Sequence, residues 1–437
     1  MVLGLLDDPD HQRRLPLTWS HADGPLVAVG SGASPATALR AAAQALAARH
    51  DPAHLHVYGL DLASQSLEPL EDLPHVGALL RPGDDERLRR LLQRLSDELA
   101  ARQAPAAAAA DRPLILILID GLAGLRAALD DRAGLAAFET LGRIVADGAA
   151  LGMLVAVAAD RSASLPAAWS AAASRRLAFR CGDPFDLLSL GADRVDQSRW
   201  PEGRCLELTS GLVAQVATGA WPPPVRGGEG PPPVRALPAE AELAPLLAAH
   251  PARAGRDGLE LPLGVDGRDL GVAVVRLRPG QPFFVCGPPG SGRTTALATL
   301  RRAAEAAGCL VAEAGAGAGL AERLAAPPAA APLVVVVDDA DRVDDLDGAL
   351  AQLATGRHAS AHVLAALPAD AGRAAFGHWT GELRRVGAGL VLRPRSDFDG
   401  DVLGIALLPV WPMSLTRPGR GVLGVAGQAV PVQVAAS

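Results

Sequence analysis

The chain has 437 residues, of which 49% are hydrophobic and only 3% aromatic, with 47 glycines and 36 prolines. This length predicts two or three domains. The apolar content excludes long disorder, and the composition excludes collagen-like and disulfide-scaffold classes. The formal charge of −7 excludes a global basic field for nucleic acid or anionic lipid. All 41 basic residues are arginine, so any site that ordinarily uses lysine has to do without it.

The first half of the chain alternates short apolar strands with helices. A small-residue loop follows the first buried strand, and a leucine-rich helix later repeats its apolar residues on one face. This alternation predicts an α/β domain with a mostly parallel sheet flanked by helices. In chain order, the expected elements are a strand at 24–30, a helix at 36–48, strands at 56–61 and 75–80, a helix at 84–102 and a strand at 114–119.

A segment rich in proline and glycine, at 221–236, follows this half. Its two triple-proline runs are unfavourable for helix and sheet, and they predict an exposed, semi-stiff linker. The linker divides the chain into a domain at 1–220 and a second, smaller domain at 237–437.

Four landmarks recur in the same order on both sides of the linker, which predicts two copies of one domain. They are a Leu-Gly pair, a strand entering a small-residue loop, an apolar strand ending in Asp, and a Pro/Gly/Arg turn before Gln-Val-Ala. From loop glycine to strand-end aspartate there are 90 positions in the first copy (30 to 120) and 51 in the second (287 to 338). We therefore expect the second copy to lack the extra strands and helix of the first.

The loop in the second copy fits the phosphate-binding pattern G-x-x-x-x-G-K-[ST] except at one position. Its glycines let the backbone wrap around an anion, and the following helix N-terminus adds positive potential. Arg293 stands where the pattern has lysine; its planar fork binds phosphate without reproducing the geometry of lysine. The alternative is a glycine-rich turn that begins an ordinary helix. The predicted nucleotide-binding residues are Gly287, Pro288, Pro289, Gly290, Ser291, Gly292, Arg293, Thr294 and Thr295.

Two carboxylates follow the apolar strand at 333–337 of the second copy. Thr294 would hold Mg²⁺ through its hydroxyl, and Asp338 would hold it through water. Asp339 is the candidate general base, about one methylene shorter than the glutamate usual in ATPases of this layout. The alternative for Asp339 is a solvated turn after a strand.

The first copy carries an altered loop. Pro35 replaces the second glycine of the pattern and Ala36 replaces the lysine. Proline has no N–H to offer a phosphate, and alanine has no charge. A glycine follows the strand-end aspartate, so no base is adjacent. We expect this degenerate site to bind no catalytic nucleotide; its remaining residues are Gly30, Thr37 and Asp120.

With these motifs, the chain resembles the C-terminal ATPase domains of the FtsK/SpoIIIE family, which belongs to the HerA–FtsK superfamily of RecA-like motors. It is most similar to the EccC/EssC branch of type VII secretion. The resemblance implies two tandem RecA-like P-loop NTPase domains that bind ATP and Mg²⁺. The loss of lysine from both loops implies weak or no hydrolysis, at most slow in the second domain. The segments that carry the resemblance are 2–12, 70–77, 119–121, 176–180, 201–204 and 418–421.

The resemblance also implies partners and a location. Trailing domains of this kind regulate a leading, membrane-anchored ATPase domain or chain and receive small WXG-type secreted proteins. They work in the cytoplasm at the inner face of the membrane, and a hexameric ring of identical chains is one assembly the resemblance allows. Candidates for an arginine that reaches a neighbour's nucleotide are Arg175, Arg176, Arg180, Arg384 and Arg385. Their ordinary alternative is an exposed flank of a strand.

Two other functions stay open. One is a fragment of a DNA translocase, although the acidic balance, the scarce aromatic residues and the missing lysine argue against DNA as a partner. The other is a free-standing nucleotide-binding scaffold. The four cysteines form no CxxC pair and have no histidine cluster beside them, which predicts free thiols rather than a zinc site: Cys181, Cys205, Cys286 and Cys309.

Overall fold

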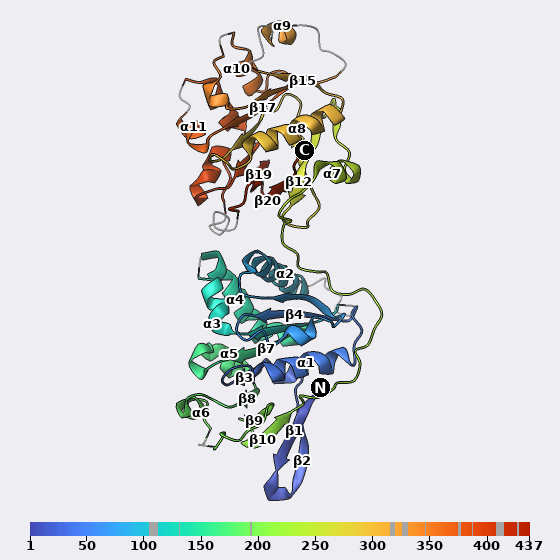
Figure 1. Cartoon of the computed structure of the whole chain (residues 1–437), viewed down its shortest axis with the longest axis vertical. Coiled ribbons are helices and arrows are strands. Elements are labelled where there is room, and N and C mark those ends of the chain that lie inside the picture. Colours follow the sequence, from blue (N-terminus) through green and yellow to red (C-terminus); the bar gives the residue numbers. More distant parts are fainter. Residues whose placement is uncertain are drawn as a thin grey trace. The chain divides into compact units, whose positions relative to one another are not determined.

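The structure is a computed structural model that divides into two compact units, Met1–Arg235 (unit 1) and Ala236–Ser437 (unit 2). In its described part, each unit is built around one ten-stranded sheet (Figure 1). No helix in that part is long and apolar enough to cross a membrane. The described residues are 1–104, 112–130, 132–192, 195–314, 320–325, 331–345, 347–374, 377–386, 388–407, 415–425 and 428–437.

The elements of unit 1 follow the predicted alternation closely. Its strands are β1 (Val2–Asp8), β2 (Arg13–Thr18), β3 (Leu26–Val29), β4 (Leu55–Asp61), β5 (Val76–Leu80), β6 (Leu114–Asp120), β7 (Met153–Ala159), β8 (Arg175–Ala178), β9 (Arg204–Glu207) and β10 (Leu212–Val216). Its helices are α1 (Ala36–Ala47), α2 (Asp85–Gln103), α3 (Leu122–Ala128), α4 (Arg132–Asp147), α5 (Ala167–Ala172) and α6 (Pro184–Ser189).

Unit 2 adds a helix and a short strand at its start and then follows a similar order with shorter insertions. Its strands are β11 (Arg253–Gly255), β12 (Gly258–Asp266), β13 (Val272–Leu277), β14 (Phe283–Cys286), β15 (Leu310–Glu313), β16 (Leu333–Val337), β17 (Ala361–Leu367), β18 (Gly389–Leu392), β19 (Arg420–Val425) and β20 (Gln428–Val434). Its helices are α7 (Leu243–Ala249), α8 (Arg293–Ala306), α9 (Leu320–Ala325), α10 (Ala349–Ala354) and α11 (Ala369–Ala374).

Each sheet joins a parallel half to an antiparallel half. In unit 1 the order is β2-β1-β10-β9-β8-β3-β7-β6-β4-β5, and the strands from β8 to β5 run parallel. In unit 2 the strands from β18 to β15 form the matching parallel set, in the order β18-β14-β17-β16-β15. The expected α/β class is confirmed, with a parallel core of six strands in unit 1 and five in unit 2 that antiparallel strands extend on one side.

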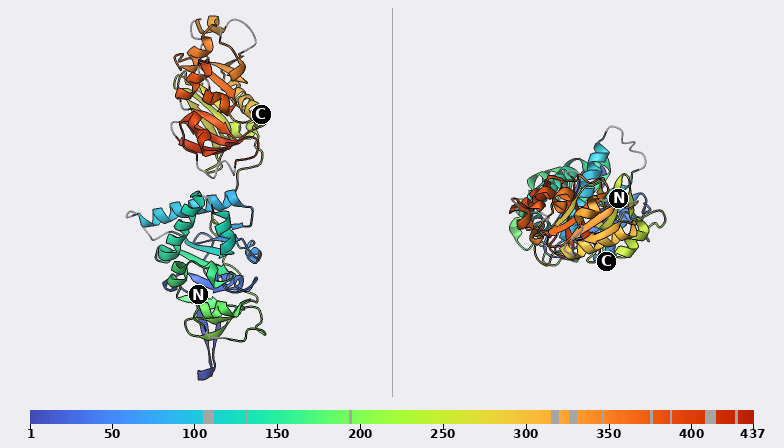
Figure 2. Two further views of the ribbon diagram at one scale, coloured as in Figure 1. Left: turned by 90° about the vertical axis from the view of Figure 1, so that its left-hand side faces the viewer. Right: turned by 90° about the horizontal axis from the view of Figure 1, so that it is seen from above.

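Helices cover both faces of the sheets, so the strands are buried on both sides (Figures 1 and 2). In β3, Val27 and Val29 belong to a core that includes residues of α2, α3 and α4. Leu26 and Ala28 belong to the core on the other face, with the alanines and leucines of α1. This explains why the parallel strands read as continuous apolar runs rather than as alternating patterns.

The repeated Leu-Gly landmark has a steric cause. Gly4 pairs with Val216 across β1 and β10, and Gly264 pairs with Val434 across β12 and β20. A Cβ atom on Gly4 would lie 2.1 Å from the carbonyl oxygen of Gln215, and on Gly264 it would lie 2.0 Å from that of Gln433. In both units the first long strand therefore pairs closely with the last one, and only glycine allows the backbones to approach.

One expectation about the second copy is wrong. Unit 2 does not lack both inner strands, because β15 pairs parallel with β16 as β4 pairs with β6. What unit 2 lacks in its described residues is a counterpart of β5, and the six-residue helix α9 stands before β16 where unit 1 has the 19-residue helix α2. The short strand β15 has an exposed Leu310 and an exposed Glu313, so its apolar signal in the sequence is weak.

The proline-rich segment at 221–236 contains neither helix nor strand. Part of it lies along unit 1 rather than in solvent, because Pro231 and Val234 are buried. The Val234 N–H donates to the carbonyl of Gly77 in β5 over 3.3 Å, and the guanidinium of Arg87 in α2 donates to the Val234 carbonyl over 2.9 Å. The segment is thus only partly exposed and covers an edge of the unit 1 sheet.

Candidate functional site

The loop between β14 and α8 has the backbone of a phosphate-binding loop. Gly290 and Gly292 adopt left-handed φ angles of 71° and 98°, which favour glycine. A Cβ atom on Gly287 would lie 2.7 Å from the carbonyl oxygen of Leu392. The Gly419 N–H of the closing turn donates to the Ser291 carbonyl over 2.9 Å. The closing turn, one of the repeated landmarks, therefore contacts this loop.

The two predicted Mg²⁺ residues lie side by side. The Thr294 hydroxyl, in the first turn of α8, donates to a carboxylate oxygen of Asp338 over 2.7 Å. Both residues are exposed, so solvent or a ligand reaches the pair. A hydroxyl and a carboxylate are oxygen donors of the kind Mg²⁺ prefers, and the residues present fit a magnesium site.

Arg293 and Asp339 form the second pair of this site. A guanidinium nitrogen of Arg293 lies 3.4 Å from a carboxylate oxygen of Asp339. The Arg293 side chain is 15% exposed and that of Asp339 is 55% exposed, so the ion pair is partly screened by water. Asp339 has a φ of 43°, in the left-handed region that aspartate tolerates better than most residues. The residue in the lysine position therefore contacts the candidate base.

In the corresponding loop of unit 1, two backbone amides donate hydrogen bonds to carbonyls at or just after the ends of neighbouring strands. The Gly30 N–H donates to the Ala159 carbonyl over 3.0 Å, and the Ser31 N–H donates to the Arg180 carbonyl over 2.8 Å. Pro35, which lacks an N–H, stands directly before α1. The first two amides of this loop are therefore already bonded, and the residue before α1 has no amide to offer a phosphate.

The side chains of Thr37 and Asp120 are buried, and each contacts a different partner. Thr37 is 1% exposed and accepts a hydrogen bond from the guanidinium of Arg40 over 3.3 Å. Asp120 is 4% exposed and accepts a hydrogen bond from the Ser64 hydroxyl. Within the described residues, no hydrogen bond joins Thr37 to Asp120, in contrast to the Thr294–Asp338 pair of unit 2.

Asp120 has a second carboxylate as its neighbour. Asp61 ends β4 in register with Asp120 at the end of β6, and it is fully buried. One oxygen of Asp61 accepts the Leu67 N–H over 2.9 Å. Burial and the nearby Asp61 charge raise the pKa of Asp120, and the Ser64 hydrogen bond partly opposes them. The two carboxyl groups thus bond to residues of the loop at 62–67, Asp120 to Ser64 and Asp61 to Leu67.

Arg40, Ser64 and Asp61 were not predicted as site residues. Arg40 also donates to the carbonyl of Ser66 over 3.2 Å and pairs with Glu202 over 3.0 Å. The i, i+3 spacing of Thr37 and Arg40 on one helix is the only local signal for this group of contacts. The other partners lie far apart in the sequence, and only the fold brings them together.

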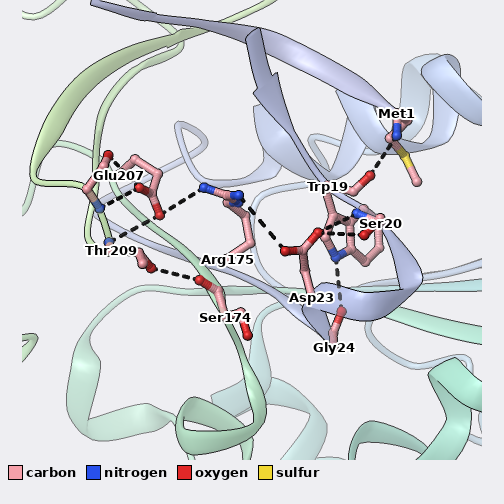
Figure 3. Close-up of polar contacts among 10 residues, drawn as sticks. Met1, Trp19, Ser20, Asp23, Gly24, Ser174, Arg175, Glu207 and Thr209 are labelled. Carbon is pink, nitrogen blue, oxygen red and sulfur yellow. Dashed lines mark hydrogen bonds and ion pairs between the residues drawn. The ribbon is translucent and has the colours of Figure 1, made fainter. Parts of the chain in front are cut away.

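Arg175 is one of the candidate arginine fingers, the arginines predicted to reach a neighbour's nucleotide. In the structure it is held inside unit 1 (Figure 3). Its guanidinium lies 3.2 Å from Glu207, whose side chain is fully buried, and 3.9 Å from Asp23. Asp23 also accepts hydrogen bonds from the backbone and hydroxyl of Ser20. These contacts give Arg175 a structural role between the ends of β8 and β9.

The other finger candidates differ in their surroundings. Arg385 pairs with Glu382 over 2.8 Å. Arg180 is exposed, and Arg176 is half-buried within β8. The side chain of Arg384 lies outside the described part. A finger role for Arg176, Arg180 or Arg385 remains a prediction.

Residues 20–110 match the model of the FtsK/SpoIIIE family. The ESX-4 secretion system protein EccC4 of Mycobacterium tuberculosis is 29% identical over 327 residues, which cover 69% of this chain and 26% of that protein. The ESX secretion system protein EccC of Thermomonospora curvata is 25% identical over 345 residues, which cover 68% of this chain and 25% of that protein. The chain thus spans about a quarter of the length of these relatives.

Solved structures show the same tandem fold. ATPases 2 and 3 of EssC from Geobacillus thermodenitrificans match with a TM-score of 0.74 at 19% identity, covering 100% of this chain and 96% of that one. ATPases 2 and 3 of Thermomonospora curvata EccC, in complex with a signal sequence peptide, match with a TM-score of 0.63 at 22% identity, covering 100% and 92%. The predicted resemblance to FtsK/SpoIIIE domains of the EccC/EssC branch is confirmed, as is the tandem ATPase fold.

Proposed function

We propose that this chain, a relative of the FtsK/SpoIIIE-type domains of EccC and EssC, is the regulatory and substrate-docking pair of a type VII secretion-type motor. In this proposal unit 2 binds ATP and Mg²⁺ and hydrolyses ATP slowly or not at all. Unit 1 binds no catalytic nucleotide. The observation that carries the proposal is the contrast between the exposed Thr294–Asp338 contact and the buried Thr37 and Asp120, which contact different partners.

The residues of unit 2 would act as follows. The amides of the loop at 287–292 and the N-terminus of α8 would hold the phosphates. Thr294 and, through water, Asp338 would hold Mg²⁺, which neutralises phosphate charge when it is bound. Arg293 would add positive charge once it leaves Asp339, since the two side chains lie 3.4 Å apart. Asp339 would then be free to orient a water molecule.

Slow hydrolysis follows from the same contacts. The guanidinium of arginine is longer and flatter than the ammonium of lysine, so Arg293 does not occupy the position in which lysine contacts the β- and γ-phosphates. Asp339 is a short base held in a left-handed backbone conformation. The binding residues are therefore better preserved than the catalytic ones, which suits a domain that responds to nucleotide more than it consumes it.

Substrate docking is supported by two observations of different kinds. The Thermomonospora curvata EccC domains were solved with a signal sequence peptide. In this chain, unit 1 already holds an extended segment along β5, through the Val234 N–H and the guanidinium groups of Arg87 and Arg94. We propose that a small WXG-type secreted protein docks on the chain.

A leading membrane-anchored ATPase domain or chain would be the second partner, at the cytoplasmic face of the membrane. The proposed assembly is a hexameric ring of identical chains.

Titration of the full chain with ATP tests the nucleotide part of the proposal. We expect wild-type binding that strengthens with Mg²⁺, and a loss of the magnesium-dependent part in Thr294→Ala. The matched control is Thr37→Ala, the same substitution at the equivalent position of unit 1, and it should leave binding unchanged. Binding that survives Thr294→Ala but disappears in Thr37→Ala would contradict the assignment of the site to unit 2.

A further inference from the structure

A second arginine lies beside the loop of unit 2. A guanidinium nitrogen of Arg393, directly after β18, donates to the carbonyl of Gly290 over 3.4 Å. Its backbone N–H donates to the carbonyl of Arg420 in the closing turn over 2.8 Å. Arg393 is half-buried, and no carboxylate among the described residues forms an ion pair with it. Its charge is therefore not neutralised by the unit itself.

The backbone of Arg393 is in an unfavourable conformation. Its φ is 44°, in the left-handed region that residues with a Cβ atom rarely adopt. Pro394 follows it, and a residue before proline is normally extended. Strain of this kind persists where the surrounding structure holds it, and it occurs frequently at ligand sites. Here the strained residue directs a guanidinium without a carboxylate partner among the described residues to the loop at 287–292.

Unit 1 contains an equivalent arginine without these features. Val29 at the end of β3 pairs with Ala178, and Cys286 at the end of β14 pairs with Val391. Arg180 and Arg393 each follow that partner by two positions, so the two arginines correspond. Arg180 does not have a positive φ, and its carbonyl is occupied by the Ser31 N–H. The strained conformation and the contact with a loop carbonyl are thus present only in the unit that keeps the phosphate-binding loop.

We propose that Arg393 is a phosphate-binding residue of unit 2, which supplies from the same chain part of the positive charge that lysine gives in related loops. This rests on the proposed nucleotide site. When phosphates occupy the loop, the guanidinium exchanges its long contact with the Gly290 carbonyl for charged hydrogen bonds to phosphate oxygens, which are stronger. The strain at Arg393 is the cost of placing the charge there.

The test uses the full chain, with Mg-ATP as the probe and Arg393→Gly as the main variant. Glycine removes the charge and also relieves the left-handed backbone. We expect Mg-ATP to bind at least about ten-fold more weakly, while the melting temperature without nucleotide stays the same or rises. Arg393→Lys keeps the charge and should retain most of the affinity. The matched control Arg180→Gly should bind Mg-ATP like the wild type.

Two results would overturn the inference and leave the proposed function intact. In the first, Arg393→Gly binds Mg-ATP like the wild type while Thr294→Ala does not. In the second, Arg393→Gly and Arg393→Lys both melt earlier and lose binding equally, which would mean that the arginine only supports the loop. If the wild-type chain itself binds no Mg-ATP, the proposed nucleotide site fails and the role of Arg393 fails with it.

Discussion

Units 1 and 2 carry the same loop and strand-end aspartate but place them in different surroundings. In unit 2, Thr294 and Asp338 contact each other at the surface. In unit 1, Thr37 and Asp120 are buried, and each has another partner, Arg40 and Ser64. The same residue types therefore form a solvent-accessible pair in unit 2, whereas in unit 1 they are buried and bond to other residues of the unit. A motif match alone does not distinguish the two cases.

The largest expected effect is on stability, and it concerns the close glycine contact between the first long strand and the last strand, which both units share. Gly264→Ala should destabilise unit 2 by about 3–5 kcal/mol, because its Cβ atom would lie 2.0 Å from a backbone oxygen. Gly4→Ala should affect unit 1 to a similar extent, since the distance there is 2.1 Å. Calorimetry of both variants checks this. If only one variant were unstable, the two copies would not share this strand contact.

A second prediction separates the units by catalysis. Arg293→Lys should raise the ATP turnover of the full chain by about ten- to a hundred-fold, since a group misplaced by about 1 Å can cost about 10²-fold. A coupled ADP-release assay measures it. Ala36→Lys, which restores lysine in unit 1, should add no turnover because Thr37 and Asp120 are buried. Brisk turnover by the wild-type chain would contradict the view that Arg293 is poorly placed.

A third prediction uses the raised pKa of Asp120. The folded unit holds this proton more tightly than the unfolded chain does, so the stabilisation is present at low pH. It is lost as the pH rises from the ordinary value of 3.8 through the raised pKa. At neutral pH, Asp120→Asn should therefore raise the melting temperature of unit 1 by about 2–4 °C.

The same variant should flatten the pH dependence of unit 1 stability above pH 3.8, the ordinary value for this carboxyl. Thermal melts across this range are the measurement. A lower melting temperature for Asp120→Asn at neutral pH would show that the carboxylate form, rather than the protonated form, supports the loop.

The smallest effect concerns Cys181, which lies beside the first loop. Burial, with a smaller contribution from Asp186, raises the pKa of its thiol to about 11, so only about one thiol in 10³ is ionised at pH 8. We expect Cys181 to be alkylated slowly, at a rate that does not change when Mg-ATP is added. Mass spectrometry of the alkylated protein measures this rate. Protection of Cys181 by Mg-ATP would place nucleotide at unit 1 and remove the difference between the units.

Many of the strands and the loop glycines could be predicted because the sequence patterns that determine them are local. Strands buried on both faces read as apolar runs, and β16 matches its predicted limits, 333–337. The glycines at 290 and 292 were recognisable because a left-handed backbone requires them. None of the four cysteines forms a disulfide in the structure. The strand β15 was missed because two of its four residues are exposed and its apolar pattern is weak.

The sequence by itself determined the duplication, the α/β class and the positions of both loops, because each of these depends on periodicity or on a short motif. Only the tertiary structure decided which strand-end aspartate is accessible and which arginines meet a loop. Arg40 and Glu202 are 162 positions apart, and Arg393 and Gly290 are 103 apart. Contacts of this kind arise from the order of the strands in the sheet. That order brings loops from distant parts of the chain to one edge, and no local pattern encodes which side chains meet there.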